Sequence, residues 1–433
     1  MMENRTMRHR IISVILCLVF VSSMFAGCAN SKKNKNPVEK DEEVHIPIIF
    51  TVSPQSGKKS NEDLVEQFNQ KYEGQYQVDV EWIMETEEEY RQNLKRQNVT
   101  DTMPAVITDL RILPSFYQMI VADERVMDLA PYMEADSEWQ DMIEPAVLEC
   151  FTEEDGSMYL APLSTAIFSC SGMFWNQELF AQAGIESFPE TWDEFWECCD
   201  QLQAHGITPL ALHTEGTAWA PMLIATAALA DTKEGAEFMN QLFPDTYQDE
   251  SGMQLAEILK KLFTYTTADA MHTDFDVSFD NFFSGKAAML PNGYWMIEQI
   301  PEEWQEKVRF SAYPGNKLVS SPETFGWAVV DYYDDDVKEG AVEFLKFRTE
   351  YNHQEKENLL KTKGKSNVAA LNDYLRVYLQ DPQIVPNYQT KWNSIFQEET
   401  LGDYLPNLAT GKITSEEFLE AADESIRQYQ AEQ

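Results

Sequence analysis

Strand-like and helix-like patterns alternate through the first part of the chain. Residues 45–54 form an apolar strand pattern that ends in a loop, and residues 76–83 alternate apolar and polar positions as a strand does. Residues 61–74 and 86–99 place apolar side chains at helical spacing, and residues 103–110 form a third strand pattern. This order predicts an α/β fold with a mostly parallel sheet, in which ligands meet the loops at the carboxyl ends of strands.

The pattern becomes more helical in the middle of the chain. Residues 188–206 carry apolar positions at helical spacing, and a mainly helical stretch extends over residues 219–265. Thr191 followed by Glu194 forms a capping box, and Pro189 disfavours helix before it. We therefore predict that a helix begins at Thr191.

The chain begins with a pattern that is typical of exported proteins. Three arginines precede a continuous apolar run at residues 11–26, and small residues stand directly before Cys28. This pattern predicts a secretory signal peptide over residues 1–27. The apolar run is also near the lower length limit for a membrane span, so an uncleaved anchor is the alternative.

Composition predicts a folded extracytoplasmic protein of two domains. Residues 28–44 contain almost nothing apolar to bury and are predicted to be a disordered tether, so folding begins near His45. The rest of the chain is longer than one hydrophobic core usually serves. The formal charge of the whole chain is −40, and it becomes −42 without residues 1–27, which carry three arginines against one glutamate. Nucleic acid is therefore a poor candidate partner, because phosphate binding needs a positive face.

Four of the six cysteines lie beyond the signal, at Cys150, Cys170, Cys198 and Cys199. An exported chain could oxidise them, and four cysteines allow three complete pairings. Cys198 and Cys199 are neighbours in a helical pattern, where a bond between them is strained. Buried free thiols are therefore favoured over disulfides.

Five stretches together resemble the extracellular solute-binding proteins of bacterial ABC importers, in the sugar-binding family 1 group. Four of them have the order and spacing of that family, and Phe25-Ala26-Gly27-Cys28 resembles the lipobox of bacterial lipoproteins. In the family, the cysteine of the lipobox becomes the first mature residue and carries a diacylglycerol. The four stretches are "DGSMYLAPLS" (155–164), residues 172–212, "FFSGKAAMLPNGYW" (282–295), and "TFGWAVV" (324–330) with "VKEGAVEFLKF" (337–347).

The resemblance implies an α/β periplasmic-binding-protein-like fold of two lobes, joined by crossing segments and closing by hinge motion around a ligand. The first lobe would comprise residues 45–165 with part of 300–350. The second lobe would comprise residues 166–299 with 325–433, including C-terminal helices. The chain would cross near 171–176 and return near 325–330. The protein would be a lipid-anchored monomer on the extracytoplasmic face of the cell membrane, without cofactor or enzymatic activity, delivering a mono- or oligosaccharide to permease subunits.

A sugar has apolar C–H faces and a rim of hydroxyls, so its pocket needs aromatic plates and polar side chains of fixed geometry. Trp219 stands in a polar, glycine-containing loop between a strand and a helix, where family members commonly place a stacking Trp. Gly293 would let the backbone turn and present Tyr294 and Trp295. Trp327, near the return crossing, would either pack in the hinge or contact the ligand.

Polar ligand contacts are predicted at other strand ends. Asp109 and Arg111 follow a strand at the edge where ligands gather, with a surface ion pair as the alternative. Glu215 has a similar place. Ser53 and Gln55 lie in the loop after the first strand, from which family members often reach the sugar.

Metal and catalytic motifs give no competing assignment of comparable strength. The acidic run at residues 267–280 has Phe279 where an EF-hand loop needs glycine, so a solvated face is favoured over a calcium site. No HExxH, G-x-S-x-G or phosphate-loop motif is present in the sequence. A lipid-anchored glycan hydrolase is the alternative function. Such enzymes use a pair of carboxylates at a defined separation, and the sequence does not determine how far apart the many Asp and Glu side chains lie in space. A second alternative is the same fold binding a polyamine.

Overall fold

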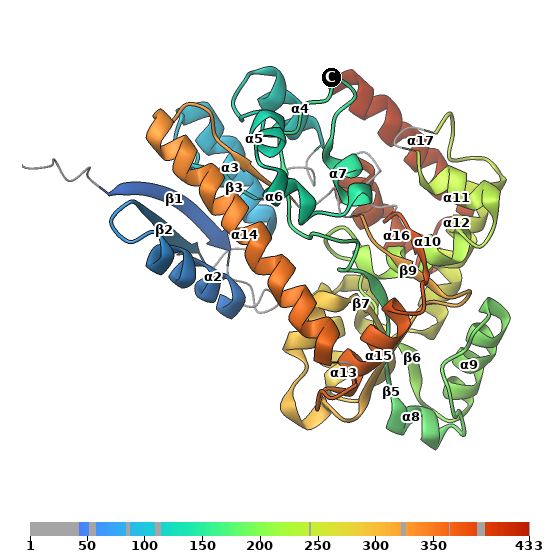
Figure 1. The fold of residues 1–433 in the computed structure, drawn as a ribbon. Helices are drawn as coiled ribbons and strands as arrows, with labels where there is room; N and C mark the ends of the chain where they lie inside the picture. Colours follow the sequence, from blue (N-terminus) through green and yellow to red (C-terminus); the bar gives the residue numbers. More distant parts are fainter. Residues whose placement is uncertain are drawn as a thin grey trace, which may run out of the picture. The chain divides into compact units, whose positions relative to one another are not determined.

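Two β-sheets with helices packed against them form the part of the chain that the structure describes (Figure 1). This computed structural model describes residues 43–51, 58–83, 87–108, 114–241, 244–321, 326–362, 364–387 and 395–432. The predicted signal peptide, Cys28 and most of the predicted tether lie outside these ranges.

The first sheet contains the three strands that the sequence pattern predicted at the start of the fold. Its order is β2-β1-β3-β10-β4. Strand β1 pairs in parallel with both β2 and β3, whereas β10 is antiparallel to β3 and β4. The strands are β1 (Val44–Thr51), β2 (Tyr76–Ile83), β3 (Val106–Ile107), β4 (Ala161–Pro162) and β10 (Gly326–Val329).

Helix α14 (Asp335–Thr362) runs alongside the first sheet, next to β1 and α2 (Figure 1). Its Phe344 packs edge-on against Phe68 of α2, with 5.0 Å between ring centroids. A methyl group on Gly340 would lie 2.7 Å from Cδ1 of Tyr76, so only glycine allows the helix to approach the sheet this closely. The other helices of this half are α2 (Lys58–Lys71), α3 (Glu87–Thr100), α4 (Pro114–Ala122), α5 (Ala130–Ala135), α6 (Ser137–Asp141) and α7 (Pro145–Phe151).

The second sheet has the order β11-β9-β5-β7-β6, and β8 pairs with β5. Strand β7 is antiparallel to β5 and parallel to β6. Every residue of β5 and β7 is buried, because helices cover the sheet. The strands are β5 (Ser171–Asn176), β6 (Thr208–Leu210), β7 (Ala287–Gly293), β8 (Val308–Ser311), β9 (Lys317–Val319) and β11 (Gln383–Val385).

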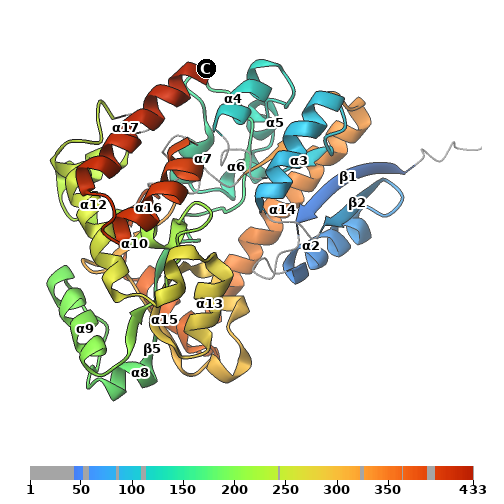
Figure 2. The same cartoon turned by 180° about the vertical axis from the view of Figure 1, so that it is seen from behind.

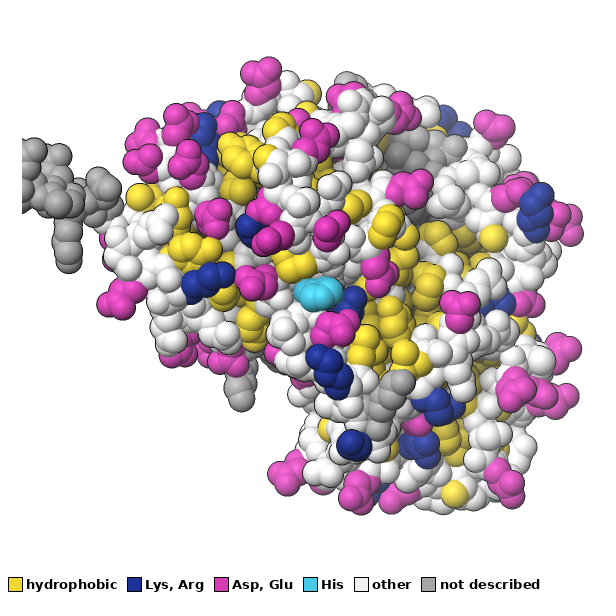
Figure 3. Space-filling model, in the orientation of Figure 1, with side chains coloured by type: hydrophobic (Ala, Val, Ile, Leu, Met, Phe, Trp, Pro, Cys, Tyr) yellow, Lys and Arg dark blue, Asp and Glu magenta, His cyan; other side chains and the backbone are white. Residues whose placement is uncertain are grey.

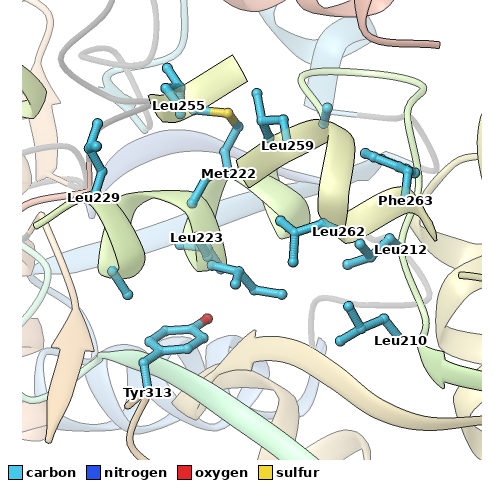
Figure 4. Close-up of a cluster of buried hydrophobic side chains, with 14 of the residues drawn as sticks. Leu210, Leu212, Met222, Leu223, Leu229, Leu255, Leu259, Leu262, Phe263 and Tyr313 are labelled. Atoms are coloured by element: carbon cyan, nitrogen blue, oxygen red, sulfur yellow. The ribbon is translucent and has the colours of Figure 1, made fainter. Parts of the chain in front are cut away.

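Apolar helices build the largest core over this second sheet. Figure 4 shows Met222, Leu223 and Leu229 of α10 beside leucines of α12, with Tyr313 below them. The C-terminal helices α16 and α17 contact α12 (Figure 2). The helices of this half are α8 (Gln177–Gln182), α9 (Trp192–Ala204), α10 (Trp219–Leu229), α11 (Lys233–Met239), α12 (Glu250–Leu262), α13 (Phe275–Phe283), α15 (Ala369–Tyr378), α16 (Leu401–Ala409) and α17 (Ser415–Glu432), with short helical turns η2 (Phe263–Tyr265), η3 (Ala268–His272), η4 (Tyr294–Gln299), η5 (Glu302–Trp304) and η8 (Phe396–Thr400).

The capping box predicted at Thr191 is present at the start of α9. The Thr191 hydroxyl accepts a hydrogen bond from the Glu194 amide at 3.3 Å. The Glu194 carboxylate accepts from the amides of Thr191 and Glu190 at 3.1 and 2.9 Å, which lowers the pKa of this carboxyl. Local sequence therefore fixes this helix end.

The chain passes from one sheet to the other between Pro162 and Ser171 and returns between Val319 and Gly326. Two side chains of α14 hold the start of the first passage. Arg348 donates from Nη2 to the Pro162 carbonyl at 3.0 Å, and Asn352 donates to the Leu163 carbonyl at 2.7 Å. The sequence prediction divided residues 300–350 between the two lobes. In the structure, β8 and β9 belong to the second sheet, and β10 belongs to the first.

None of the four cysteines beyond the signal forms a disulfide. Cys170, Cys198 and Cys199 are buried, and Cys150 is partly buried. Burial raises the pKa of Cys170 to about 11 and that of Cys198 to about 12. The favoured prediction of free thiols is confirmed, and three of them are buried as expected.

Candidate ligand-binding site

The predicted aromatic candidates of the second sheet follow two neighbouring parallel strands. Leu210 of β6 pairs with Met289 of β7, so the loops after these strands leave the same edge of the sheet. Ser171, where the chain enters this sheet, pairs with Gly293 and Val319 at that edge. The loops that carry Trp219 and Trp295 therefore lie where the chain passes between the two sheets.

The first sheet has the corresponding edge at the carboxyl ends of β1, β2 and β3. Gly326 of β10 pairs with Pro162 of β4, and both passages between the sheets begin or end at this pair. In the sequence, Ser53 and Gln55 follow β1, and Asp109 and Arg111 follow β3. These four predicted contacts lie outside the described residues.

Trp219 is the first residue of α10 and is half-buried. Its ring lies against Phe275, with 4.7 Å between centroids, and meets the His213 ring edge-on at 5.6 Å. Ala218 before it has a φ of 47°, in the left-handed region that residues other than glycine seldom adopt. The turn therefore places the indole at a strand end with only part of its surface covered.

The loop that leads to Trp219 is tied to the segment before α13. The amides of Thr214 and Glu215 donate to the Thr273 carbonyl at 3.3 and 3.1 Å. The Thr214 hydroxyl donates to the Ala270 carbonyl at 3.2 Å. Glu215 itself is exposed, so the structure places its side chain at the surface of this loop.

His213 is a buried polar residue of the site that sequence reasoning did not single out. Its Nδ1 lies 3.1 Å from the Glu215 carbonyl oxygen, which can only accept, so Nδ1 carries the proton. Burial lowers the pKa of His213 to about 4, against smaller raising effects of the Glu215 carbonyl and Asp274. The imidazole next to Trp219 is therefore neutral. The position of His213 between a strand pattern and a polar loop was the sequence feature from which it could have been predicted as a site residue.

Tyr294 and Trp295 are neighbours in sequence but have different surroundings. The Tyr294 ring packs against Phe168 and Tyr374, with centroid distances of 4.8 and 5.0 Å, and burial raises its pKa. Trp295 is 45% exposed. The chain turns from β7 into η4 directly after Gly293, as predicted, but Gly293 has φ −115° and ψ −179°, an extended backbone that any residue adopts, so the turn does not need the conformational freedom of glycine.

Trp327 lies in the core of the first sheet and is 5% exposed. The Arg348 guanidinium lies over its ring at 3.9 Å from the centroid, and Phe50 packs against it at 5.3 Å. Of the two roles predicted for Trp327, this position fits packing beside the passage between the sheets.

Trp82 is an aromatic residue near the same edge that sequence reasoning missed. It lies next to the end of β2, is partly buried, and stacks on Phe50 at 5.3 Å and 30°. The alternation of residues 76–83 places it on the inward face with Val78 and Val80. An inward-facing Trp at the carboxyl end of a predicted strand was the sequence feature from which Trp82 could have been predicted as a site residue.

Two surface hollows lie away from these aromatic residues, so they do not define the site. One, of about 480 Å³, is lined by residues at the end of α14 and the start of α15. The other, of about 600 Å³, lies beside α8 and includes Trp175 and Arg309. Neither is lined by Trp219 or Trp295.

The acidic run before α13 has a structural use. The Asp274 carboxylate accepts from the Val277 amide at 3.2 Å and caps α13. Within the described ranges, no group of three or more His, Cys, Asp or Glu residues is arranged to hold a metal ion. Among the helices that the structure describes, none has the length and apolarity required to cross a membrane.

Comparisons with known proteins identify the family. Residues 63–368 match the family described as "Bacterial extracellular solute-binding protein". A "Probable sugar-binding periplasmic protein" of Brucella suis biovar 1 (strain 1330) is 29% identical over 161 residues, 36% of each chain. The match thus spans about a third of that relative.

Solved structures show the fold. A "Chitin oligosaccharide binding protein" superposes with a TM-score of 0.71 at 18% identity, covering 90% of this chain and 99% of the other. A Streptococcus pneumoniae solute-binding protein in complex with the blood group A-trisaccharide gives a TM-score of 0.68 at 17% identity, covering 89% and 100%. The predicted two-lobe α/β fold is confirmed, and so is the family that the sequence motifs indicated. This chain belongs to the bacterial extracellular solute-binding proteins.

Proposed function

We propose that the protein captures a mono- or oligosaccharide between its two lobes and delivers it to the permease of an ABC transporter. The observation that carries this proposal is Trp295, a large aromatic side chain 45% exposed at the strand edge where the chain passes between the sheets. Trp219 follows the neighbouring parallel strand at the same edge. Exposed indoles suit the apolar faces of sugar rings. Family membership and the sugar-binding names of relatives support this reading.

Residues in the loops around Trp219 and Trp295 would form hydrogen bonds with the sugar hydroxyls. Glu215 lies exposed in the loop before Trp219 and is the described candidate. Ser53, Gln55, Asp109 and Arg111 are the further candidates, because their loops follow β1 and β3 at the corresponding edge of the first sheet. Tyr294 and Trp327 instead support the site from the cores.

Ligand binding would shift the protein from an open to a closed arrangement of its lobes. A ligand that contacts both sheet edges binds the closed state more tightly and therefore increases its population. We assign one lobe to each sheet, which moves β10 and α14 from the predicted second lobe to the first. The bending would occur where the chain passes between the sheets. A monomer suffices for this mechanism, because each chain supplies both edges.

We also propose that Cys28 carries the lipid anchor that holds the mature chain at the extracytoplasmic face of the cell membrane. Two acyl chains or more bind a membrane far more stably than one, at roughly 0.8 kcal/mol for each buried methylene. The test is metabolic labelling with a fatty-acid analogue. Wild type is expected to incorporate label, and Cys28→Ala to lose it. Label retained in the variant would show that a residue other than Cys28 carries the lipid and would contradict this proposal.

A thermal-shift panel tests the ligand class. It would contain chitin oligosaccharides, blood group A trisaccharide, raffinose and monosaccharides, with spermidine and peptides as non-sugar probes. A ligand at 100 times its dissociation constant adds about 2.7 kcal/mol to the free energy of unfolding. We expect a sugar to raise the melting temperature and to be recovered unchanged. A higher melting temperature with spermidine alone would support the alternative that the protein binds a polyamine. Figure 3 shows Asp and Glu side chains spread over one face of the molecule, and such a surface attracts cations. Sugar cleavage would support a hydrolase instead.

A further inference from the structure

The Trp295 indole lies directly over the backbone of Gly293. A methyl group built on Gly293 would lie 2.0 Å from Cζ3, 2.2 Å from Cη2 and 2.4 Å from Cε3 of that indole. All three atoms belong to the six-membered ring. The ring therefore occupies the space in which any other residue at position 293 would carry its Cβ.

Backbone conformation does not explain the glycine. Its φ of −115° and ψ of −179° are extended values that any residue adopts. What the position requires is the absence of a side chain, so that the indole can rest on the main chain. Gly293 thus acts through Trp295 and not through the turn.

The backbone beneath the indole is held on several sides. Gly293 pairs with Ser171 of β5, and its amide donates to Oδ1 of the buried Asn292 at 2.7 Å. The Tyr294 amide donates to the Cys170 carbonyl at 3.0 Å, and the Tyr294 ring packs into the core. One face of the Trp295 ring therefore rests on a fixed support, while 45% of the residue is exposed.

We propose that Gly293 is a positioning residue, which holds the Trp295 indole flat against β7 so that its outer face is ready to stack on the apolar face of a sugar ring. This inference rests on the proposed function for its ligand, and on the described geometry for the position of the ring. A plate that is already in place loses little rotamer freedom on binding, so its contact energy contributes more fully to affinity. Gly293→Ala displaces the indole and removes this advantage.

The position of the ring can be tested without ligand. Protein labelled with 5-fluorotryptophan gives ¹⁹F resonances, and the one lost in Trp295→Phe belongs to Trp295. We expect Gly293→Ala to move this resonance and change its solvent isotope shift, while the other tryptophan resonances stay in place. An unmoved Trp295 resonance would overturn the inference, whether or not any sugar binds.

The role in binding is tested with the sugar that gives the largest shift in the thermal panel. Gly293→Ala is expected to weaken its binding about 5- to 150-fold, the same range that we predict for Trp295→Ala. In the Trp295→Ala background, Gly293→Ala should have no further effect, because no indole remains to be displaced. Additive losses in the double variant would contradict positioning and indicate a general disturbance of the site.

A matched control separates positioning from loss of stability. A methyl on Gly340 also meets an aromatic ring, 2.7 Å from Cδ1 of Tyr76, but in the core of the first sheet. Gly340→Ala should lower the melting temperature and leave the affinity unchanged. Equal loss of affinity in Gly340→Ala and Gly293→Ala would overturn the positioning role. If wild type binds none of the sugars, the proposed function fails, and the ¹⁹F result alone decides whether Gly293 positions the indole.

Discussion

Individual tryptophans in this protein differ chiefly in how much of the ring is covered. Trp295 is 45% exposed and Trp219 is half-buried, and both lie in segments that follow parallel strands. Trp139 is 1% exposed, and its Nε1 donates to the Thr349 hydroxyl at 3.0 Å. Substitution should therefore separate binding from stability.

We predict that Trp219→Ala and Trp295→Ala each weaken sugar binding by about 1 to 3 kcal/mol, with a modest effect on melting of the ligand-free protein. Trp139→Ala should lower the free energy of unfolding by about 3 to 5 kcal/mol and leave affinity intact. Titration below the melting range and thermal unfolding of the three variants provide the measurements. If the first two unfold like Trp139→Ala and bind normally, the site assignment is wrong.

His213 should make stability depend on pH in a defined range. Its pKa in the folded protein is about 4, below the value of about 6.5 for the unfolded chain. Between these values the unfolded chain binds more protons, so stability falls as pH is lowered from 6.5 to 4 and no further below 4. The loss approaches about 3 kcal/mol across this window.

The variant His213→Asn isolates this effect, because Asn does not titrate and retains a side-chain N–H. Urea unfolding at pH 7.5 and pH 4.5 should show a smaller difference in the variant than in wild type. All other ionisable side chains are the same in the two proteins, so the difference between them isolates His213. Equal pH dependence in the two proteins would show that His213 is not buried and neutral in the folded state.

We predict that the reactivity of each cysteine thiol in the native protein depends on how deeply that cysteine is buried. Burial raises the pKa of Cys170 to about 11 and that of Cys198 to about 12, and Cys199 is likewise buried. Native protein that lacks Cys28 should react with Ellman's reagent at no more than one thiol, that of the partly buried Cys150. In urea all four should react. Rapid reaction of several thiols in the native state would contradict the described core.

Helices and strands whose signals are local were predictable from the sequence. The parallel strands β1, β2 and β3 follow from apolar and alternating patterns, and the start of α9 follows from the capping residues at Thr191. The place of β10 between β3 and β4 was not predictable, because four residues carry no local signal for their distant partners. The role of Gly293 was missed for the same reason, since it depends on where a side chain folds back.

The capping box gives a prediction at the scale of one helix. Thr191→Ala removes the hydroxyl that accepts from the Glu194 amide, and should lower the free energy of unfolding by about 1 kcal/mol. Thr191→Ser keeps the acceptor and is the matched control, expected to remain close to wild type. Urea unfolding of both variants provides the comparison. Equal destabilisation by Ser and Ala would mean that the hydroxyl does not contribute through the cap.

At the scale of the whole molecule, two sheets present strand ends at the places where the chain passes between them. Parallel pairing of β6 with β7 brings the loops of Trp219 and Trp295 to one edge, although 75 residues separate the two tryptophans along the chain. Side chains of α14 hold the first passage through the carbonyls of Pro162 and Leu163. Sequence motifs identified the family, but only the fold shows which candidates share an edge.

The most direct test of the central claim is calorimetric titration of the mature protein with the sugar that stabilises it most in the thermal panel. We predict one site per chain, unchanged sugar after binding, and an affinity reduced about 5- to 150-fold in Trp295→Ala. Absence of binding heat across the whole sugar panel, or full affinity in Trp295→Ala, would contradict it.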